Sequence, residues 1–276
     1  MSPIFPPVRA CLFDMDGLLI NTEDIYTKCA SIVLERYGRP PLPWSVKALM
    51  MGVPGSSNGD TFHDWAQLPI SRERFRQEQA EQQRIHFPEC RPLPGVERLL
   101  ADLKTARTAA AGDGDAVQIA LATSSAKENL DMKSEAAATA ALIALIPPEH
   151  RVLGDDPRMR RGKPAPDIYL VALKAINENL PDGVPEIAPR ECLVFEDSVI
   201  GVEAGRRAGM RVVWVPHPAL LAEYVGREAE VLAGRIGLVP LGDEGQLGQL
   251  GDGWAEQLPS LENFPYERYG IFPRWS

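Results

Sequence analysis

The sequence predicts an α/β fold with a parallel sheet core and an inserted all-helical cap domain. Short apolar runs alternate with segments of helical period, polar residues follow the runs, and one long helical stretch interrupts the alternation. Alternating strands and helices are typical of a parallel sheet covered by helices on both faces. With 276 residues, of which 45% are hydrophobic, the chain can build one large domain or two ordinary ones. We therefore expect a Rossmann-like core.

Five short apolar runs are the predicted strands. Each ends in polar or turn-forming residues, as buried parallel strands do. They span residues 8–13, 117–122, 152–154, 192–195 and 212–215.

Four segments between these runs have helical period. They span residues 95–107, 126–138, 165–179 and 198–208. In the third, Ile168, Leu173 and Ile176 recur near the helical period, and Pro166 suits a helix start. The alternation of these helices with the strands places ligands beyond the carboxyl ends of the strands.

The predicted division is a core of residues 1–18 and 91–276 and a helical cap of residues 19–90. Two segments near residues 105–115 and 226–257 are rich in small residues and are interpreted as accessory surface insertions of the core.

Three helices are predicted within the cap. Asn21 or Thr22 caps the first, which stops at Gly38. The second spans 44–52, and the third spans 71–86 and is polar, so most of it should face solvent.

Charge and composition exclude several classes of protein. A formal net charge of -9 argues against nonspecific binding to nucleic acid or anionic membranes, whereas a local pocket can still take a small phosphorylated molecule. The longest run of small apolar residues, 136–146, is too short to cross a bilayer, which needs about 20 residues. The four cysteines lie far apart and indicate neither a disulfide framework nor a zinc site. Because the first ten residues lack a secretory pattern, we expect a cytoplasmic protein.

The first strand ends in Asp14-Met-Asp16-Gly17. Two carboxylates two positions apart on this turn can both face a ligand, and Gly17 permits a close backbone approach. A hard cation such as Mg²⁺ takes oxygen ligands, which Asp14 and Asp197 can supply. A carboxylate can also act as a covalent nucleophile that forms an aspartyl phosphate. Taken alone, the motif is equally typical of a solvated turn.

Three further strand-end motifs each have two interpretations. Thr123 and Ser124 can bind a phosphate at a helix start or simply cap that helix. Lys163 can neutralise charge on a transferring phosphoryl group or lie in solvent. Glu196 and Asp197 are adjacent carboxylates that repel unless a cation lies between them, although Asp197 can instead cap the next helix.

In combination, the four motifs resemble those of the haloacid dehalogenase-like (HAD) hydrolase superfamily. In chain order they are Asp14-x-Asp16, Thr123-Ser124, Lys163 and Glu196-Asp197. Five longer stretches are similar to the pseudouridine-5'-phosphatase group of that superfamily: 44–52, 120–125, 152–157, 162–168 and 192–197. The similarity covers residue 8 to about residue 216, and both accessory segments depart from the group.

The resemblance implies a Mg²⁺-dependent phosphomonoesterase. Asp14 would attack phosphorus, and Asp16 would protonate the leaving alcohol and later deprotonate the hydrolytic water. Thr123, Ser124 and Lys163 would bind the phosphoryl oxygens.

The resemblance also implies which residues bind the metal and which part of the protein contacts the rest of the substrate. Mg²⁺ would be held by the Asp14 carboxylate, the Asp16 backbone carbonyl and Asp197, with Glu196 binding directly or through a neighbour. Cap closure would exclude water and set selectivity. The candidate cap contacts are Asn21, Glu23, Met51 and Gly52.

Alternative functions remain at this point. A sugar phosphomutase shares the four motifs but needs a second acid/base group from the cap; related mutases carry a histidine where Tyr26 falls, so the sequence favours hydrolysis. A dehalogenase has no need of Asp16. A non-catalytic module that binds a phosphorylated ligand is a third alternative. The expected partner is a small phosphorylated metabolite, such as pseudouridine monophosphate, a hexose phosphate or glycerol phosphate, and the expected state is a monomer.

Overall fold

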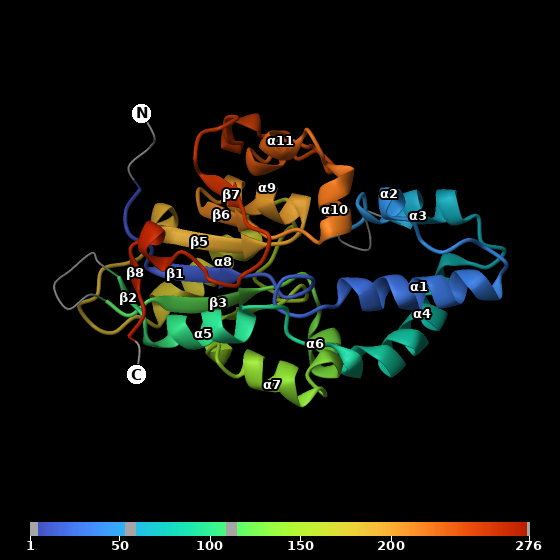
Figure 1. Cartoon of the computed structure of the whole chain (residues 1–276), viewed down its shortest axis with the longest axis horizontal. Helices are drawn as coiled ribbons and strands as arrows, with labels where there is room; N and C mark the ends of the chain where they lie inside the picture. The colour runs from blue at the N-terminus through green and yellow to red at the C-terminus, as the bar shows by residue number, and fades with distance from the viewer. Residues whose placement is uncertain (1–4, 53–58, 109–114, 275–276) are drawn as a thin grey trace.

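The computed structural model describes residues 5–52, 59–108 and 115–274. Its main sheet has six strands in the order β4-β3-β1-β5-β6-β7, and every neighbouring pair is parallel (Figure 1). The strands are β1 (Ala10–Phe13), β3 (Gln118–Ala122), β4 (Arg151–Val152), β5 (Cys192–Glu196), β6 (Arg211–Trp214) and β7 (Ala255–Gln257). The predicted parallel α/β core is confirmed.

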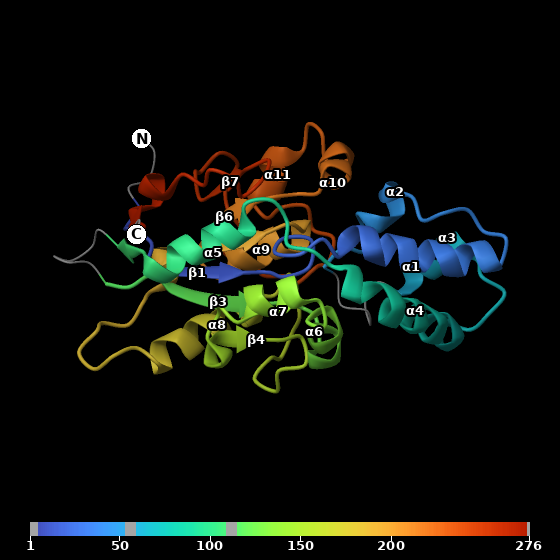
Figure 2. The ribbon, with the colours of Figure 1, turned by 60° about the horizontal axis from the view of Figure 1, so that its bottom comes forward.

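Helices cover both faces of this sheet. They are α5 (Val96–Thr105) on one face and α8 (Asp167–Glu178) and α9 (Val199–Arg207) on the other. Figure 2 shows α5 and α8 on opposite sides of the central strands. Successive residues of a strand point to opposite faces, so Cys11 and Phe13 pack in the α5 cluster, whereas Ala10 and Leu12 pack with α8 and α9. Burial on both faces explains why the central strand β1 is apolar at every residue.

The single helix predicted for residues 126–138 is wrong. The structure has α6 (Lys127–Lys133), a turn, and then α7 (Ala137–Ile143). Ala136, with φ -70° and ψ 119°, takes an extended backbone between them. The break lets both Leu130 and Leu142 face the core.

The C-terminal segment does more than form a surface insertion. Residues 255–257 form β7, which pairs with β6 and extends the sheet. The three residues Ala-Glu-Gln contain no apolar run, so the sequence pattern missed the strand. Within 226–257, Val231 is fully buried, and Asp252 accepts a hydrogen bond from Arg206 of α9 at 3.0 Å. The segment therefore covers α9.

The remaining core elements are short. They are β2 (Arg107–Thr108), η2 (Pro148–His150), η3 (Pro189–Glu191), α10 (Pro218–Glu223), α11 (Glu228–Leu232), η4 (Glu244–Gln246), η5 (Tyr266–Tyr269) and β8 (Ile271–Phe272). β2 pairs antiparallel with β8. The predicted insertion near 105–115 begins around β2, and its residues 109–114 lie outside the described residues.

Residues 19–90, which we call the cap, form helices joined by turns and irregular segments where the structure describes them. The helices are α1 (Glu23–Arg36), α2 (Trp44–Lys47), α3 (Gly59–Ala66) and α4 (Arg72–His86), followed by η1 (Phe87–Glu89). α1 and α4 lie side by side beyond one end of the sheet (Figures 1 and 2). Val33, Leu34, Phe62 and Phe75 form an apolar cluster within the cap.

Three details of the cap differ from the predictions. The second helix ends at Lys47 rather than Gly52, and α3 was not predicted. Thr22 is the N-cap residue of α1, but its side chain accepts no capping hydrogen bond. α4 faces solvent over most of its length, as predicted, and its buried Glu78 accepts hydrogen bonds from Tyr37 and Arg74, each at 2.7 Å.

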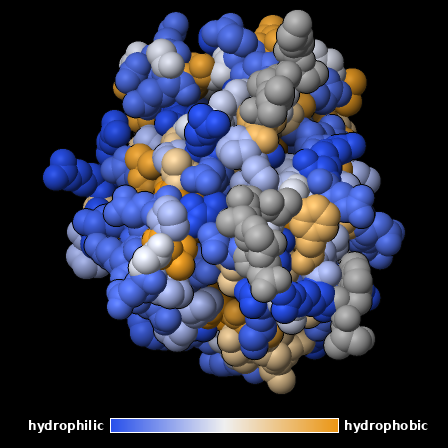
Figure 3. Space-filling model, turned by 90° about the vertical axis from the view of Figure 1, so that its left-hand side faces the viewer, coloured by the Kyte–Doolittle hydropathy of each residue, from blue (hydrophilic) through white to orange (hydrophobic). Residues whose placement is uncertain are grey.

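The opposite end of the molecule, where both termini lie, shows mostly hydrophilic side chains with apolar ones scattered among them (Figure 3). Within the described ranges, we find no helix with the length and apolar character to span a membrane.

Candidate active site

The predicted site residues gather at one edge of the sheet. Asp14 follows β1, Thr123 follows β3 and Asp197 follows β5, and β1 lies between the other two strands. Because all three strands are parallel, their carboxyl ends meet, and the cap lies beyond the same edge (Figure 1).

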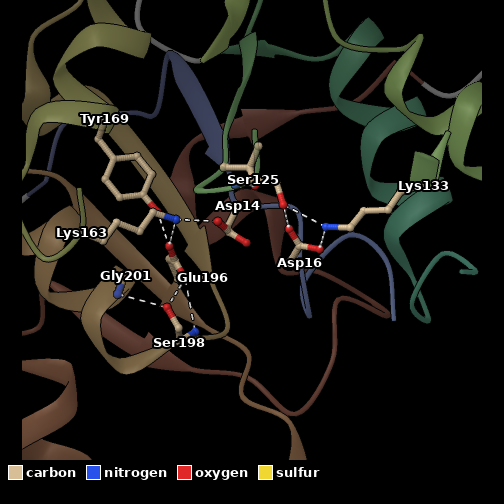
Figure 4. Close-up of polar contacts among 10 residues, drawn as sticks. Asp14, Asp16, Ser125, Lys133, Lys163, Tyr169, Glu196, Ser198 and Gly201 are labelled. Carbon is tan, nitrogen blue, oxygen red and sulfur yellow. Dashed lines mark hydrogen bonds and ion pairs between the residues drawn. The ribbon is translucent and has the colours of Figure 1, made fainter. Parts of the chain in front are cut away.

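Lys163 is at the centre of this group. Its ammonium lies 2.5 Å from Asp14 Oδ1 and 2.5 Å from Glu196 Oε1, and the residue is 2% exposed (Figure 4). The solvated interpretation of this lysine is therefore wrong. Burial lowers the pKa of Lys163, but Asp14 and Glu196 outweigh it and raise the pKa above the ordinary value, so the ammonium stays charged.

Glu196 is fully buried, and both its oxygens accept hydrogen bonds. Oε1 accepts from Lys163 and from the Tyr169 hydroxyl, each at 2.5 Å. Oε2 accepts from Ser198 through its backbone nitrogen at 3.2 Å and its hydroxyl at 3.1 Å. A Cβ at Gly201 would lie 2.0 Å from this carboxylate, so the helix needs glycine there. Glu196 thus orients Lys163 and the start of α9.

Asp197 has a free acceptor. Its Oδ2 is buried and has no hydrogen-bond partner among the residues that the structure describes. Ser198, rather than Asp197, caps α9, since its hydroxyl accepts from the Gly201 nitrogen at 3.2 Å. Trp214 donates to the Asp197 carbonyl at 2.8 Å and fixes the turn. Gly17 has φ +79°, and a Cβ there would lie 2.2 Å from Asp197 Oδ2. The turn after β1 is therefore shaped around this carboxylate.

The residues present fit a divalent cation. Asp14, Glu196 and Asp197 each offer an oxygen, and these oxygens all lie within 4.8 Å of one another. Burial raises the pKa of Asp14 to about 7, with Glu196 adding and Lys163 opposing. Burial, Glu23 and Asp14 raise the pKa of Asp197 well above its usual range. These three buried carboxylates outnumber the one ammonium, that of Lys163, which contacts them. Among the described residues, Asp197 Oδ2 also has no hydrogen-bond partner. Such a set of oxygen donors suits a hard cation.

Asp16 lies on the other side of Asp14 (Figure 4). Its Oδ2 accepts from the Ser125 hydroxyl at 2.6 Å, and its Oδ1 forms an ion pair with Lys133. Burial raises the pKa of Asp16, but Lys133 and Ser125 outweigh it and hold the pKa below its ordinary value. Lys133 was not predicted as a site residue. The sequence did hold one indication of its burial, because Lys133 comes three positions after Leu130 and so lies on the same, buried face of α6.

Thr123 and Ser124 occupy different environments. Thr123 is fully buried, and its hydroxyl accepts from the Ser125 nitrogen at 3.1 Å. It does not cap α6, whose N-cap residue is Ala126. Ser124 is exposed and lines a pocket of about 400 Å³ together with Lys163. The loop after β3 thus presents Ser124 beside the lysine.

The four predicted cap contacts lie where the cap meets the core, Asn21 through its backbone nitrogen, which donates to the Arg91 carbonyl at 2.9 Å. Glu23 is paired with Lys47, with Oε2 2.8 Å from the ammonium, and its side chain also lies against the glycine turn after β1. Met51 packs in the apolar cluster of α8 and α9. Gly52 has φ +70° and abuts the start of α9. Asn21 is half-buried on the turn before α1.

The fold and this site define an α/β enzyme with its chemistry at the carboxyl edge of a parallel sheet. A family model described as haloacid dehalogenase-like hydrolase matches residues 11–215, and the chain belongs to this family.

Two curated relatives and one solved structure illustrate the similarity. A Saccharomyces cerevisiae protein named "Probable pseudouridine-5'-phosphatase" is 38% identical over 96% of this chain and 98% of its own length. The mitochondrial (DL)-glycerol-3-phosphatase 1 of Arabidopsis thaliana is 35% identical over 83% of this chain and 71% of its own. The crystal structure of a beta-phosphoglucomutase from Clostridium difficile has a TM-score of 0.57, covering 78% of this chain and 88% of its own at 20% identity, which shows the fold alone. Like these two relatives, the chain is a phosphatase.

Proposed function

We propose that the protein is a Mg²⁺-dependent phosphomonoester hydrolase that acts through an aspartyl-phosphate intermediate on a small phosphorylated metabolite. The observation that carries the proposal is the buried ammonium of Lys163 between Asp14 and Glu196, beside an oxygen of Asp197 that has no hydrogen-bond partner in the described part of the chain. Phosphoryl transfer depends mainly on positioning and on neutralising charge, and this arrangement provides both.

Asp14 is the proposed nucleophile. Its carboxylate attacks phosphorus, the bond from phosphorus to the leaving oxygen breaks, and the aspartyl phosphate forms. Lys163 contacts the same carboxylate, so it also lies next to the transferring group and stabilises its charge. Ser124 and Thr123, at the end of β3, are the proposed further contacts of the phosphoryl oxygens.

Asp16 is the proposed acid and base. The ion pair with Lys133 favours the ionised form of Asp16, so Asp16 takes up a proton before it protonates the leaving alcohol. As a carboxylate it then takes a proton from the water that attacks the aspartyl phosphate. That attack releases inorganic phosphate and frees Asp14. The two steps return both carboxyl groups to their starting forms.

Asp14 and Asp197 would hold Mg²⁺, with the Asp16 backbone carbonyl. Glu196 would act through Lys163 and Ser198, because its own oxygens already accept hydrogen bonds. When bound, the cation supplies positive charge that offsets the carboxylates and polarises the phosphoryl group.

The substrates named for the relatives set the candidates for the leaving group: pseudouridine 5'-phosphate or a sugar or polyol phosphate. The candidate contacts for this half are Glu23, Met51 and Gly52. Hydrolysis is favoured over a mutase reaction because Tyr26 occupies the expected acid/base position of the cap, and its hydroxyl contacts Lys133 at 3.1 Å.

The test is phosphate release from a panel of monoesters, with Mg²⁺ and with chelator. The panel contains pseudouridine 5'-phosphate, uridine 5'-phosphate, glucose 1-phosphate, glycerol 3-phosphate and p-nitrophenyl phosphate. We expect metal-dependent release from at least one alkyl ester, and no release by Asp14→Asn. Turnover that persists in Asp14→Asn would contradict the nucleophile assignment. Conversion of glucose 1-phosphate to glucose 6-phosphate would favour the mutase.

A further inference from the structure

Lys133 is a fully buried lysine outside the group around Asp14. Its ammonium lies 2.9 Å from the Ser125 hydroxyl and 3.1 Å from the Tyr26 hydroxyl, and it forms an ion pair with Asp16. It also lies over two aromatic rings, 5.1 Å from the centroid of Tyr26 and 4.9 Å from that of Phe87. Its side chain is 0% exposed.

Burying an ammonium is expensive unless hydrogen bonds and an opposite charge replace its water. α6 could fill the same space with an apolar side chain of similar length, such as methionine. The position instead holds a charge whose carboxylate partner is the proposed acid/base. The contacts of this lysine therefore point to a role at Asp16 rather than to packing alone.

Lys133 and Ser125 together fix the orientation of Asp16. One carboxylate oxygen meets the ammonium and the other meets the hydroxyl, and Lys133 and Ser125 also hydrogen-bond each other (Figure 4). These contacts close a triangle around the carboxylate. A general acid or base must lie within hydrogen-bond reach of the proton that it transfers, and small misplacements are costly.

The ammonium is in turn held from the cap. Tyr26 lies on α1 and Phe87 lies in η1, whereas Lys133 belongs to α6 of the core. The three mutual contacts of Asp16, Ser125 and Lys133 thus lie where cap and core meet. The rings of Tyr26 and Phe87 cover the Lys133 ammonium on the side of the cap.

We propose that Lys133 is a positioning residue that holds Asp16 for both proton transfers, with Tyr26 holding Lys133 in place. This inference rests on the proposed phosphatase mechanism. It concerns proton transfer and not the formation of the phosphorus–Asp14 bond. Losing Lys133 should therefore slow the steps in which Asp16 moves a proton and spare a step that needs no proton.

Two kinds of ester separate these steps. An alkyl leaving group needs a proton from Asp16 as its bond to phosphorus breaks. p-Nitrophenolate leaves without a proton, so the phosphoryl group of an aryl ester can pass to Asp14 without help from Asp16. Hydrolysis of the aspartyl phosphate needs Asp16 as base for either ester.

The experiment compares wild type with Lys133→Met, Lys133→Gln and Lys127→Met. Lys127 lies on the same helix with its side chain 69% exposed, so its variant is the matched control. We expect Lys133→Met to lower kcat at least 30-fold with the best alkyl ester and to change KM less than threefold. With p-nitrophenyl phosphate, rapid mixing should show a burst of about one nitrophenolate per active site at a near wild-type rate, followed by slowed turnover. Lys133→Gln retains a donor and should recover part of kcat, and Lys127→Met should match wild type.

The proposal is overturned if Lys133→Met retains wild-type kcat on the alkyl ester, or if burst and steady-state rates fall by the same factor, which marks a general structural defect. If the Lys133 variants do not fold, Tyr26→Phe tests the same proposal, because it removes the hydroxyl that helps to hold the Lys133 ammonium in place. We expect three- to tenfold lower kcat on the alkyl ester with an unchanged burst rate, and an equal loss of both rates would overturn the proposal. Failure of the proposed function looks different, because wild type itself would then release no phosphate from any ester.

Discussion

Asp14→Asn should alter the pH dependence of stability as well as abolish activity. The variant keeps the shape of the side chain and its hydrogen-bonding capacity toward Lys163 but removes the buried negative charge. The wild-type carboxyl is 5% exposed and lies among other acidic groups. Its charge is therefore unfavourable for the metal-free fold.

The magnitude follows from the pKa of Asp14, which burial raises from 3.8 to about 7. Between these values the folded protein holds a proton that the unfolded chain releases, so stability is lost as pH rises. The loss is about 1.4 kcal/mol per pH unit and is complete above the folded pKa. From pH 5 to pH 8 the group titrates over about two units, which amounts to about 3 kcal/mol.

The assay is urea unfolding of both proteins in chelator at pH 5, 6, 7 and 8. The free energy of unfolding of Asp14→Asn, relative to wild type, should rise by about 3 kcal/mol from pH 5 to pH 8. In thermal unfolding this is about 6–12 °C for a chain of this size. Asp131→Asn, at a carboxylate whose side chain is 61% exposed, is the control for the aspartate-to-asparagine substitution itself.

Adding Mg²⁺ at pH 8 should stabilise wild type and narrow this gap, because the cation binds the ionised carboxylate and not the amide. A difference between Asp14→Asn and wild type that stays constant from pH 5 to pH 8 would refute the reasoning, since it would mean that Asp14 ionises as freely in the fold as in the unfolded chain.

Three further outcomes are expected. Lys163→Met should lower kcat about 10²–10³-fold, measured as phosphate release, because it removes the ammonium at the transferring group; a near wild-type rate would exclude that role. Gly201→Ala should lower the free energy of unfolding by about 1–3 kcal/mol in urea, because its Cβ would lie 2.0 Å from the Glu196 carboxylate; unchanged stability would show that this carboxylate moves freely. Removal of divalent cations with EDTA should abolish phosphate release and Mg²⁺ should restore it, whereas persistent activity in chelator would count against a metal site at Asp14 and Asp197.

Much of the core was predictable from local patterns. β1, which precedes Asp14, is apolar at every residue because it is buried on both faces, and the first four residues of β5, 192–195, are apolar for the same reason. Parallel pairing then places both carboxylates at one edge of the sheet. Lys163 required more than a local pattern, because the loop before α8 must fold back over β1 to bring it to Asp14.

Other parts could not be predicted because their role exists only in three dimensions. β7 is a strand by virtue of its pairing with β6, and its own residues are polar. Tyr169 and Ser198 look like ordinary helix residues until Glu196 is placed between them. Lys133 lies 117 positions from Asp16 in the chain, and only the packing of α6 joins them.

Two of the buried lysines, Lys133 and Lys163, divide the charges around Asp14 and Asp16 into unequal parts. Lys133 balances Asp16 one to one, and this pair is neutral by itself. Lys163 faces the three carboxylates of Asp14, Glu196 and Asp197, which leaves two negative charges when all are ionised. In the metal-free fold, protonation relieves this excess, which is why burial and neighbouring acids raise the pKa of Asp14 and Asp197. A divalent cation would remove the excess without protons, so the proposed nucleophile Asp14 would stay ionised at neutral pH while the Asp16 carboxylate keeps its ion pair with Lys133. The separation of Lys133 from Lys163 would thus let a metal offset the charge around Asp14 without changing the charge balance between Asp16 and Lys133.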